Sequence, residues 1–145
     1  MRHQESQSLR EVVDREAIRN LPLRYCDCVW RKDVDGYLEL FTSDGWVATA
    51  DLNIQRAQGR EGLRKMITEA FDTMKPRPFI HNHVFELIGP NRAKGRCYLE
   101  ARLTHQGKRS LMTGYYDDEY VKVDGQWKFQ SRNTTIDSFV PLKED

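Results

Sequence analysis

The chain has 145 residues, of which 39% are apolar and 31% are charged, and its 23 lysines and arginines nearly balance its 22 aspartates and glutamates. This length is expected to fold as one domain over residues 1–145, and the balance of charge argues against a nucleic-acid partner and against a polybasic membrane-surface protein. No apolar run approaches the roughly twenty residues needed to cross a membrane. The charged N-terminus does not have the pattern of a signal peptide, so we expect a cytoplasmic protein.

The first third of the chain is predicted to be helical. A short apolar stripe follows Ser8, which is a plausible N-cap, so residues 1–13 are expected to form an extension or a short helix. Apolar side chains over residues 18–29 then recur at helical spacing. Pro22 lies inside this pattern and should kink the helix or begin a new one. Asp33 is the expected N-cap of a second helix.

The remainder is predicted to be strand, interrupted by one more helix. Residues 46–50 and 54–57 form a short strand pair, and the helix that begins near Gly59 has the clearest amphipathic pattern in the chain. Four long strands, separated by turns rich in Gly, Pro, Asn and Asp, cover residues 79–88, 93–104, 109–123 and 127–139. Together these elements predict an α+β domain in which a strongly curved, mostly antiparallel sheet wraps around the N-terminal helices and leaves an internal cavity.

Five short motifs follow one another between residues 14 and 141. They are Ala17–Leu21 with Arg24-Tyr25, Asp33–Asp35 with Leu40–Gly45, Gly59–Leu63, Asp118–Tyr120, and Asp124–Phe129 with Arg132. In type and order they resemble the SnoaL-like branch of the nuclear-transport-factor-two-like superfamily, whose fold is a cone-shaped α+β roll. Because that superfamily includes scytalone dehydratase, ketosteroid isomerase and polyketide cyclases, the resemblance implies cofactor-independent proton transfer beside a carbonyl or leaving group in an apolar pocket.

Two histidines are the first candidates for moving a proton. His81 and His83 are two residues apart on a predicted strand, so both should point to the same face, which they share with Phe79 and Phe85. A histidine in such a place can titrate near neutrality and act as acid or base. The alternative is a pair of structural histidines bonded to backbone or tyrosine. No carboxylate stands beside them in sequence, so we expect no metal site.

The resemblance adds roles for three further residues. It implies that Tyr25 points its hydroxyl into the pocket and polarises a substrate carbonyl, although a buried tyrosine can also serve only the core. Trp30 stands where the related dehydratases have the aspartate that pairs with the catalytic histidine, so the resemblance implies that this chain lacks the usual histidine–aspartate pair. Arg132 would hold a carboxylate, phenolate or enolate if it points inward, or else would form a cross-strand ion pair.

Other polar and aromatic side chains are candidates for the pocket wall. Asp51 is a possible substitute acid, with an ordinary loop acid as the alternative, and at most one of the neighbours Tyr115 and Tyr116 can face the cavity. The predicted substrate-binding residues are Trp30, Trp46, Asp51, Phe79, Tyr98 and Tyr115.

These observations favour a cofactor-independent lyase or isomerase that acts on a small cyclic, aromatic, polyketide-like or steroid-like molecule. His81 or His83 would carry the proton, Tyr25 would polarise the carbonyl and Arg132 would hold the anion. The alternatives are a non-catalytic protein that binds a small hydrophobic or aromatic ligand, and a structural subunit like the β subunits of ring-hydroxylating dioxygenases. A histidine within hydrogen-bond reach of a carboxylate inside the cavity would favour the enzyme.

We also expect a homo-oligomer that forms through the outer face of the sheet. A dimer is favoured over a trimer, since closed two-fold pairing is the commonest symmetry of soluble homo-oligomers.

Overall fold

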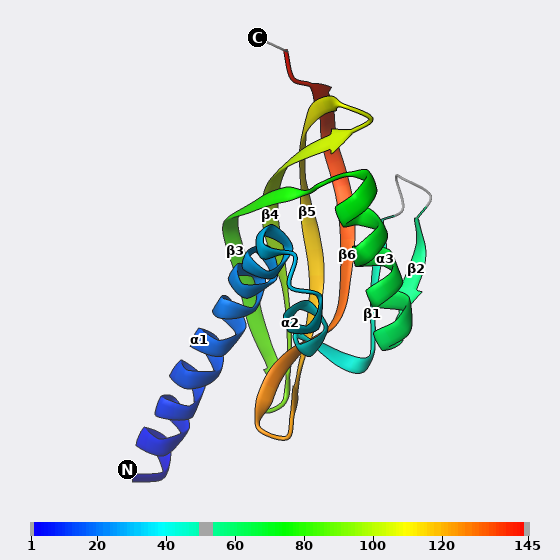
Figure 1. Cartoon of the computed structure of the whole chain (residues 1–145). Coiled ribbons are helices and arrows are strands. Elements are labelled where there is room, and N and C mark those ends of the chain that lie inside the picture. The colour runs from blue at the N-terminus through cyan, green and yellow to red at the C-terminus, as the bar shows by residue number, and fades with distance from the viewer. Residues whose placement is uncertain (1, 50–53, 144–145) are drawn as a thin grey trace.

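The computed structural model describes residues 2–49 and 54–143, with the backbone alone for residues 2–4, 54 and 55, and Figure 1 shows the chain. In chain order the elements are α1 (Arg2–Arg31), α2 (Val34–Glu39), β1 (Phe41–Thr49), β2 (Ile54–Gln58), α3 (Gly59–Thr73), β3 (Arg77–Gly89), β4 (Arg92–His105), β5 (Lys108–Val123) and β6 (Gln126–Pro141). The helices and a sheet of long strands confirm the predicted α+β class.

The sheet has the strand order β2-β1-β6-β5-β4-β3. β1 lies parallel to β6, and all other neighbours are antiparallel. The β4–β5 turn at Gln106-Gly107 and the β5–β6 turn at Asp124-Gly125 each have two successive residues with positive φ. This is the geometry of type I′ hairpin turns, whose twist matches that of the flanking strands. The predicted meander of long strands is therefore confirmed.

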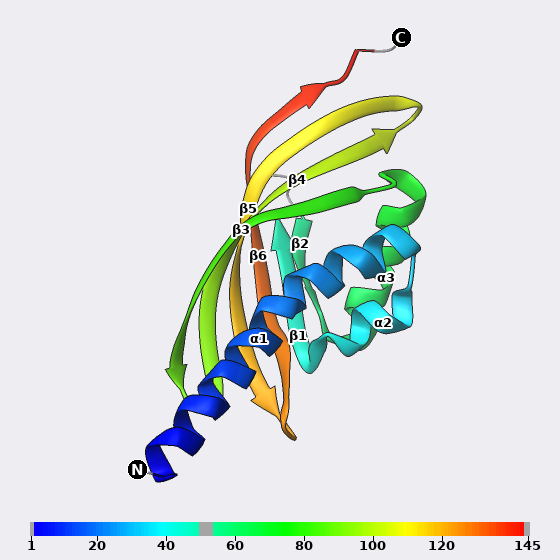
Figure 2. The ribbon, with the colours of Figure 1, turned by 90° about the vertical axis from the view of Figure 1, so that its left-hand side faces the viewer.

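The sheet bends strongly around the helices, as Figure 2 shows. The sheet has register shifts in β3 and between β5 and β6, where one strand has an extra residue. One of these shifts lies at Gly114, where a Cβ would collide with the carbonyl oxygen of Thr135. Bulges and a glycine at a close backbone approach are the usual means of curving a sheet.

The three helices cover the inner face of the sheet (Figures 1 and 2). The buried apolar residues of α1 and α3 include Ile18, Leu21, Tyr25, Val29, Leu63, Ile67 and Phe71. Asp14 fixes α1 to the β5–β6 hairpin, because its Oδ1 accepts hydrogen bonds from Lys122 Nζ (3.0 Å) and Trp127 Nε1 (2.9 Å). Within residues 2–49 and 54–143, no helix combines the length and apolar character needed to cross a membrane.

The N-terminal helix differs from the prediction in its starting residue. It begins at Arg2 rather than after Ser8, since the residues that precede Ser8 include good helix formers and neither Gly nor Pro. Of the two alternatives for Pro22, a new helix is excluded, because α1 continues through this buried proline. Packing of the apolar face of α1 outweighs the backbone hydrogen bond lost at this proline.

Candidate functional site

An apolar pocket of about 140 Å³ lies between α3 and the inner face of the sheet, and we call it the inner pocket. Its lining includes Val47, Met66, Ile67, Met74, Leu99 and Met112. Four hydroxyl-bearing side chains, those of Tyr25, Thr49, Tyr116 and Thr134, add polar atoms to the wall. None of the described lining residues is a histidine, lysine, arginine, aspartate or glutamate.

Three buried tyrosines gather beside this pocket. Tyr25 on α1 and Tyr116 on β5 line it, and their ring centroids are 5.8 Å apart. Tyr37 on α2 donates a hydrogen bond to Tyr25 Oη (3.4 Å). Burial raises the pKa of Tyr25, although Arg132 opposes the effect, and it raises the pKa values of Tyr37 and Tyr116 well above the ordinary range. All three phenols therefore stay neutral, and Tyr25 and Tyr116 keep a proton to donate to a ligand.

A buried ion pair supports two of these tyrosines. Arg132 and Asp118 are opposite each other on β6 and β5, and Nε and Nη2 donate to Oδ1 (2.7 Å) and Oδ2 (3.0 Å). The guanidinium carbon lies 3.7 Å from the ring centroid of Tyr116 and 4.4 Å from that of Tyr25. Burial alone would lower the pKa of Arg132, but Asp118 more than offsets this and the pKa is raised. Of the alternatives for Arg132, the structure contains the cross-strand ion pair.

The ion pair continues into a chain of hydrogen bonds that ends at His83. Tyr120 Oη lies 2.9 Å from Asp118 Oδ2 and 2.9 Å from His83 Nε2. An ionised carboxylate only accepts hydrogen bonds, so the Tyr120 hydroxyl donates to Asp118 and must accept from Nε2–H of His83. The remaining ring nitrogen, Nδ1, is buried and has no hydrogen-bond partner among the described residues.

His83 is consequently a neutral imidazole with a lone pair on Nδ1. Burial lowers the pKa of His83 from 6.5 to about 4, an effect that Asp118 opposes and that Arg132 and Arg19 reinforce. The histidine reaches a carboxylate only through Tyr120, and neither residue lines the inner pocket. The direct histidine–carboxylate contact that would favour an enzyme is thus not found in the part of the pocket wall that the structure describes.

The expectation that His81 and His83 share a face is wrong. Ile80 pairs with Leu99 and His83 pairs with Cys97, so β3 advances three residues where β4 advances two. This bulge reverses the alternation of side chains, and His81 lies on the exposed outer face, where Nε2 is 3.6 Å from Glu100 Oε2. Phe79 is also exposed there, whereas Phe85 stays beside His83.

Trp30 lies at the rim of the inner pocket instead of inside it. Its Nε1–H donates to the carbonyl oxygen of Pro78 (2.6 Å), and its ring packs edge-on against Phe79. Pro78 itself lines the pocket. The indole therefore braces the start of β3 and leaves the interior of the pocket open.

Three other predicted binding residues also face outward. The Arg56 guanidinium lies 3.8 Å from the ring centroid of Trp46, and Tyr98 packs against Tyr115 on the outer face. Asp51 lies outside the described residues. Tyr116, which was not among the predicted binding residues, is the member of the Tyr115-Tyr116 pair that enters the pocket. The alternation of apolar residues in β4 could have indicated the orientation of Tyr116. Cys97 lies on the buried face of β4 and pairs with Tyr116, so both side chains point to that face.

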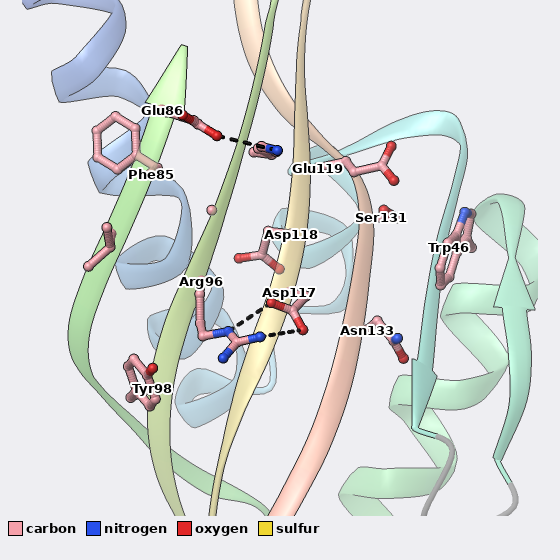
Figure 3. A pocket seen from close by; sticks show the side chains of 13 residues that line it. Trp46, Phe85, Glu86, Arg96, Tyr98, Asp117, Asp118, Glu119, Ser131 and Asn133 are labelled. Carbon is pink, nitrogen blue, oxygen red and sulfur yellow. Dashed lines mark hydrogen bonds and ion pairs between the residues drawn. The ribbon is translucent and has the colours of Figure 1, made fainter. Parts of the chain in front are cut away.

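The outer face of the sheet has a groove of its own, of about 930 Å³, which we call the outer groove. Figure 3 shows Trp46, Arg96, Tyr98 and Asp117 around it. Arg96 binds Asp117 through Nε (2.9 Å) and Nη2 (3.2 Å). The guanidinium at the centre of this groove is thus already paired, and the groove offers less specific chemistry than the inner pocket.

The curved sheet, the three covering helices and the pocket between them define an α+β roll of the nuclear-transport-factor-two-like type. The SnoaL-like domain family matches residues 10–133, and the chain belongs to this family. No curated protein matches the sequence significantly.

Solved structures agree on the fold. Hexachlorocyclohexane dehydrochlorinase LinA-type3 from Novosphingobium barchaimii LL02 superposes with a TM-score of 0.87 at 19% identity, over 95% of this chain and 96% of that one. A candidate scytalone dehydratase from Novosphingobium aromaticivorans DSM 12444 gives 0.82 at 21% identity, over 95% and 93%. A protein of unknown function from Mycobacterium tuberculosis gives 0.77 at 25% identity, over 88% and 73%.

Proposed function

We propose that the inner pocket binds a small, largely apolar molecule that carries a hydrogen-bond acceptor. One observation carries this proposal: an apolar pocket has the neutral phenols of Tyr25 and Tyr116 in its wall, backed by the paired charges of Arg132 and Asp118. Apolar walls with a few placed polar groups are typical of small-molecule sites. No cofactor has a role in this proposal.

The phenols explain why the ligand needs an acceptor. A buried hydroxyl that gains no partner loses the hydrogen bonds it makes in water. Tyr25 already accepts from Tyr37, so its own proton is left to be donated to an acceptor. A carbonyl oxygen is the group that best meets this requirement.

Methionine methyl groups provide the test of binding. The chain has four methionines, and Met66, Met74 and Met112 line the inner pocket. We expect cyclohexanone to shift the carbon-13 methyl signals of these three residues. Ala70→Phe, which adds a ring to the pocket wall, should abolish the shifts. Unchanged spectra of the wild-type protein would contradict the proposal.

A second candidate function is cofactor-independent elimination or isomerisation. The observation in its favour is the Nδ1 lone pair of His83, held neutral and linked through Tyr120 and Asp118 to the arginine behind the pocket. His83 would remove a proton beside a carbonyl that Tyr25 polarises. Because His83 does not line the inner pocket and its Nδ1 is buried, the side chains that cover Nδ1 must move before a substrate can reach it. The dehydrochlorinase and the candidate dehydratase share the fold, which supports this candidate.

Exchange of protons for deuterium tests the second candidate without a known substrate. 2-Tetralone is a bicyclic ketone with acidic protons beside its carbonyl, and NMR in heavy water measures their exchange. If the chain is a catalyst of this kind, the exchange rate rises above the buffer rate and His83→Ala removes the increase. His81→Ala, on the outer face, is the matched control and should leave it intact. An exchange rate equal to that of buffer would contradict catalysis while leaving binding untouched.

A further inference from the structure

We infer that the inner pocket selects an uncharged, planar, single-ring compound with a carbonyl group and rejects ring carboxylates. This inference rests on the proposed binding function and adds the chemical class of the ligand. Three independent properties of the pocket lead to it: its volume, its sulfur atoms and its balance of charge.

The volume sets the size of the ligand. The inner pocket measures about 140 Å³. An engineered apolar cavity of about 150 Å³ in another protein accepts one benzene ring. The pocket therefore has room for a single six-membered ring with a small substituent, and a fused-ring compound would have to project from it.

The thioethers favour an unsaturated ring. Three of the residues that line this small pocket, Met66, Met74 and Met112, are methionines on two different walls, since two come from the α3 region and one from β5. A thioether sulfur is attracted to an aromatic ring, and an unbranched side chain adapts to a flat ligand. The rings of Tyr25 and Tyr116 add further flat apolar surface. A planar ring gains from both kinds of contact.

The charges exclude an anionic ligand. Both oxygens of Asp118 are bound by Arg132, so the pair behind the phenols has no net charge. None of the described wall residues is a cation. A ligand carboxylate would lose its hydration without meeting a compensating charge, which is costly in an apolar site. A neutral carbonyl oxygen, in contrast, can accept from the phenol of Tyr25 or Tyr116.

Three probes of similar shape test the inference: acetophenone, benzoate and ethylbenzene. Binding is followed through the carbon-13 methyl signals of Met66, Met74 and Met112 at neutral pH. Acetophenone should bind at least about tenfold more tightly than benzoate, because only benzoate must bury a charge. It should bind about fivefold more tightly than ethylbenzene, which has no acceptor for the phenols.

Variants assign the preference to the phenols. In Tyr25→Phe/Tyr116→Phe the advantage of acetophenone over ethylbenzene should disappear, while Tyr98→Phe on the outer face should preserve it. Benzoate binding as tightly as acetophenone would overturn the inference and leave pocket binding standing. A preference that survives in the double variant would also overturn it. If no probe shifts the three methionines, the proposed binding function fails together with the inference.

Discussion

Asp118 and Arg132 face each other across β5 and β6 and hold a fully buried ion pair with two hydrogen bonds, of 2.7 and 3.0 Å. The arginine end supports the phenols of the inner pocket, and the carboxylate end accepts a hydrogen bond from Tyr120, which in turn binds His83. The pair thus connects the pocket wall to the histidine. A substitution at the pocket tyrosines should therefore alter the environment of His83, and a substitution at His83 should alter that of the tyrosines.

Removing one member of this pair should destabilise the fold strongly. Arg132→Met leaves the Asp118 carboxylate without its countercharge in the core, and we expect the free energy of unfolding in urea to fall by about 3–5 kcal/mol. Arg96→Met is the matched control, because Arg96 makes a similar two-point contact with Asp117 on the partly exposed outer face. Solvent screens that pair, so a loss of similar size in both variants would contradict the prediction.

Replacing both members of the buried pair should cost less than replacing one. Arg132→Met/Asp118→Leu removes the uncompensated charge together with its partner and fills the space with apolar atoms. The double variant should be more stable in urea than Arg132→Met. If it is equally unstable, the loss comes from packing and not from the unpaired carboxylate.

The hydrogen-bond chain predicts one tautomer of His83. Nitrogen-15 NMR should show the proton on Nε2 and a bare Nδ1, because Tyr120 can accept only from Nε2–H once it donates to Asp118. Tyr120→Phe removes the acceptor, and we expect a mixture of the two tautomers together with a loss of about 1–3 kcal/mol of stability. A wild-type spectrum with the proton on Nδ1 would contradict the direction of the chain.

Much of this fold could be predicted from the sequence, because the elements depend on local periodicity. The amphipathic spacing of α3 and the turn residues at Gly107 and Gly125 are local signals, and both features are present in the structure. The resemblance motifs likewise led to the family that the match over residues 10–133 shows.

The face of the sheet to which each side chain points was harder to predict, because one extra residue in a strand reverses the alternation. The segment from Ile80 to His83 contains neither Gly nor Pro to mark a bulge, so strict alternation placed both histidines on one face. The Asp118–Arg132 pair depends on the register of two strands and not on local spacing. The sequence indicates Tyr120 only as part of a motif. Its hydrogen bond to His83 joins residues 37 positions apart, which local spacing cannot predict.

The low pKa of His83 predicts a loss of stability in mild acid. Burial keeps this pKa at about 4 in the folded protein, against 6.5 for an ordinary histidine. As pH falls below 6.5, the unfolded chain gains a proton that the folded chain does not, so unfolding becomes more favourable. The stability contributed by neutral His83 is therefore complete above pH 6.5 and lost as the pH falls toward 4.

Chemical denaturation at a series of pH values checks this prediction. As pH falls from 7 to 4, the unfolding free energy of the wild type should decrease by more than that of His83→Gln. His81→Gln is the matched replacement of the other β3 histidine. A change of the same size in that variant would show that His83 is not the source.

We propose, finally, that two copies of the chain pair through the outer face of the sheet. This face bears exposed apolar side chains that the described residues leave uncovered, among them Val84 (68% exposed) and Tyr98 (41% exposed). Two arginine or lysine side chains of this face are paired with carboxylates of the same copy, in the Arg96–Asp117 and Lys94–Glu86 pairs, which lowers the repulsion between two identical faces.

Light scattering at micromolar concentration measures this pairing directly. The expected mass is twice the 17.1 kDa of one chain. Val84→Glu should lower it, because two like charges would be buried at a two-fold interface. Leu9→Glu is the matched control, since Leu9 is equally exposed on α1, away from the outer face. A wild-type mass of 17.1 kDa would contradict pairing, and a mass that Val84→Glu leaves at the dimer value would place the interface elsewhere.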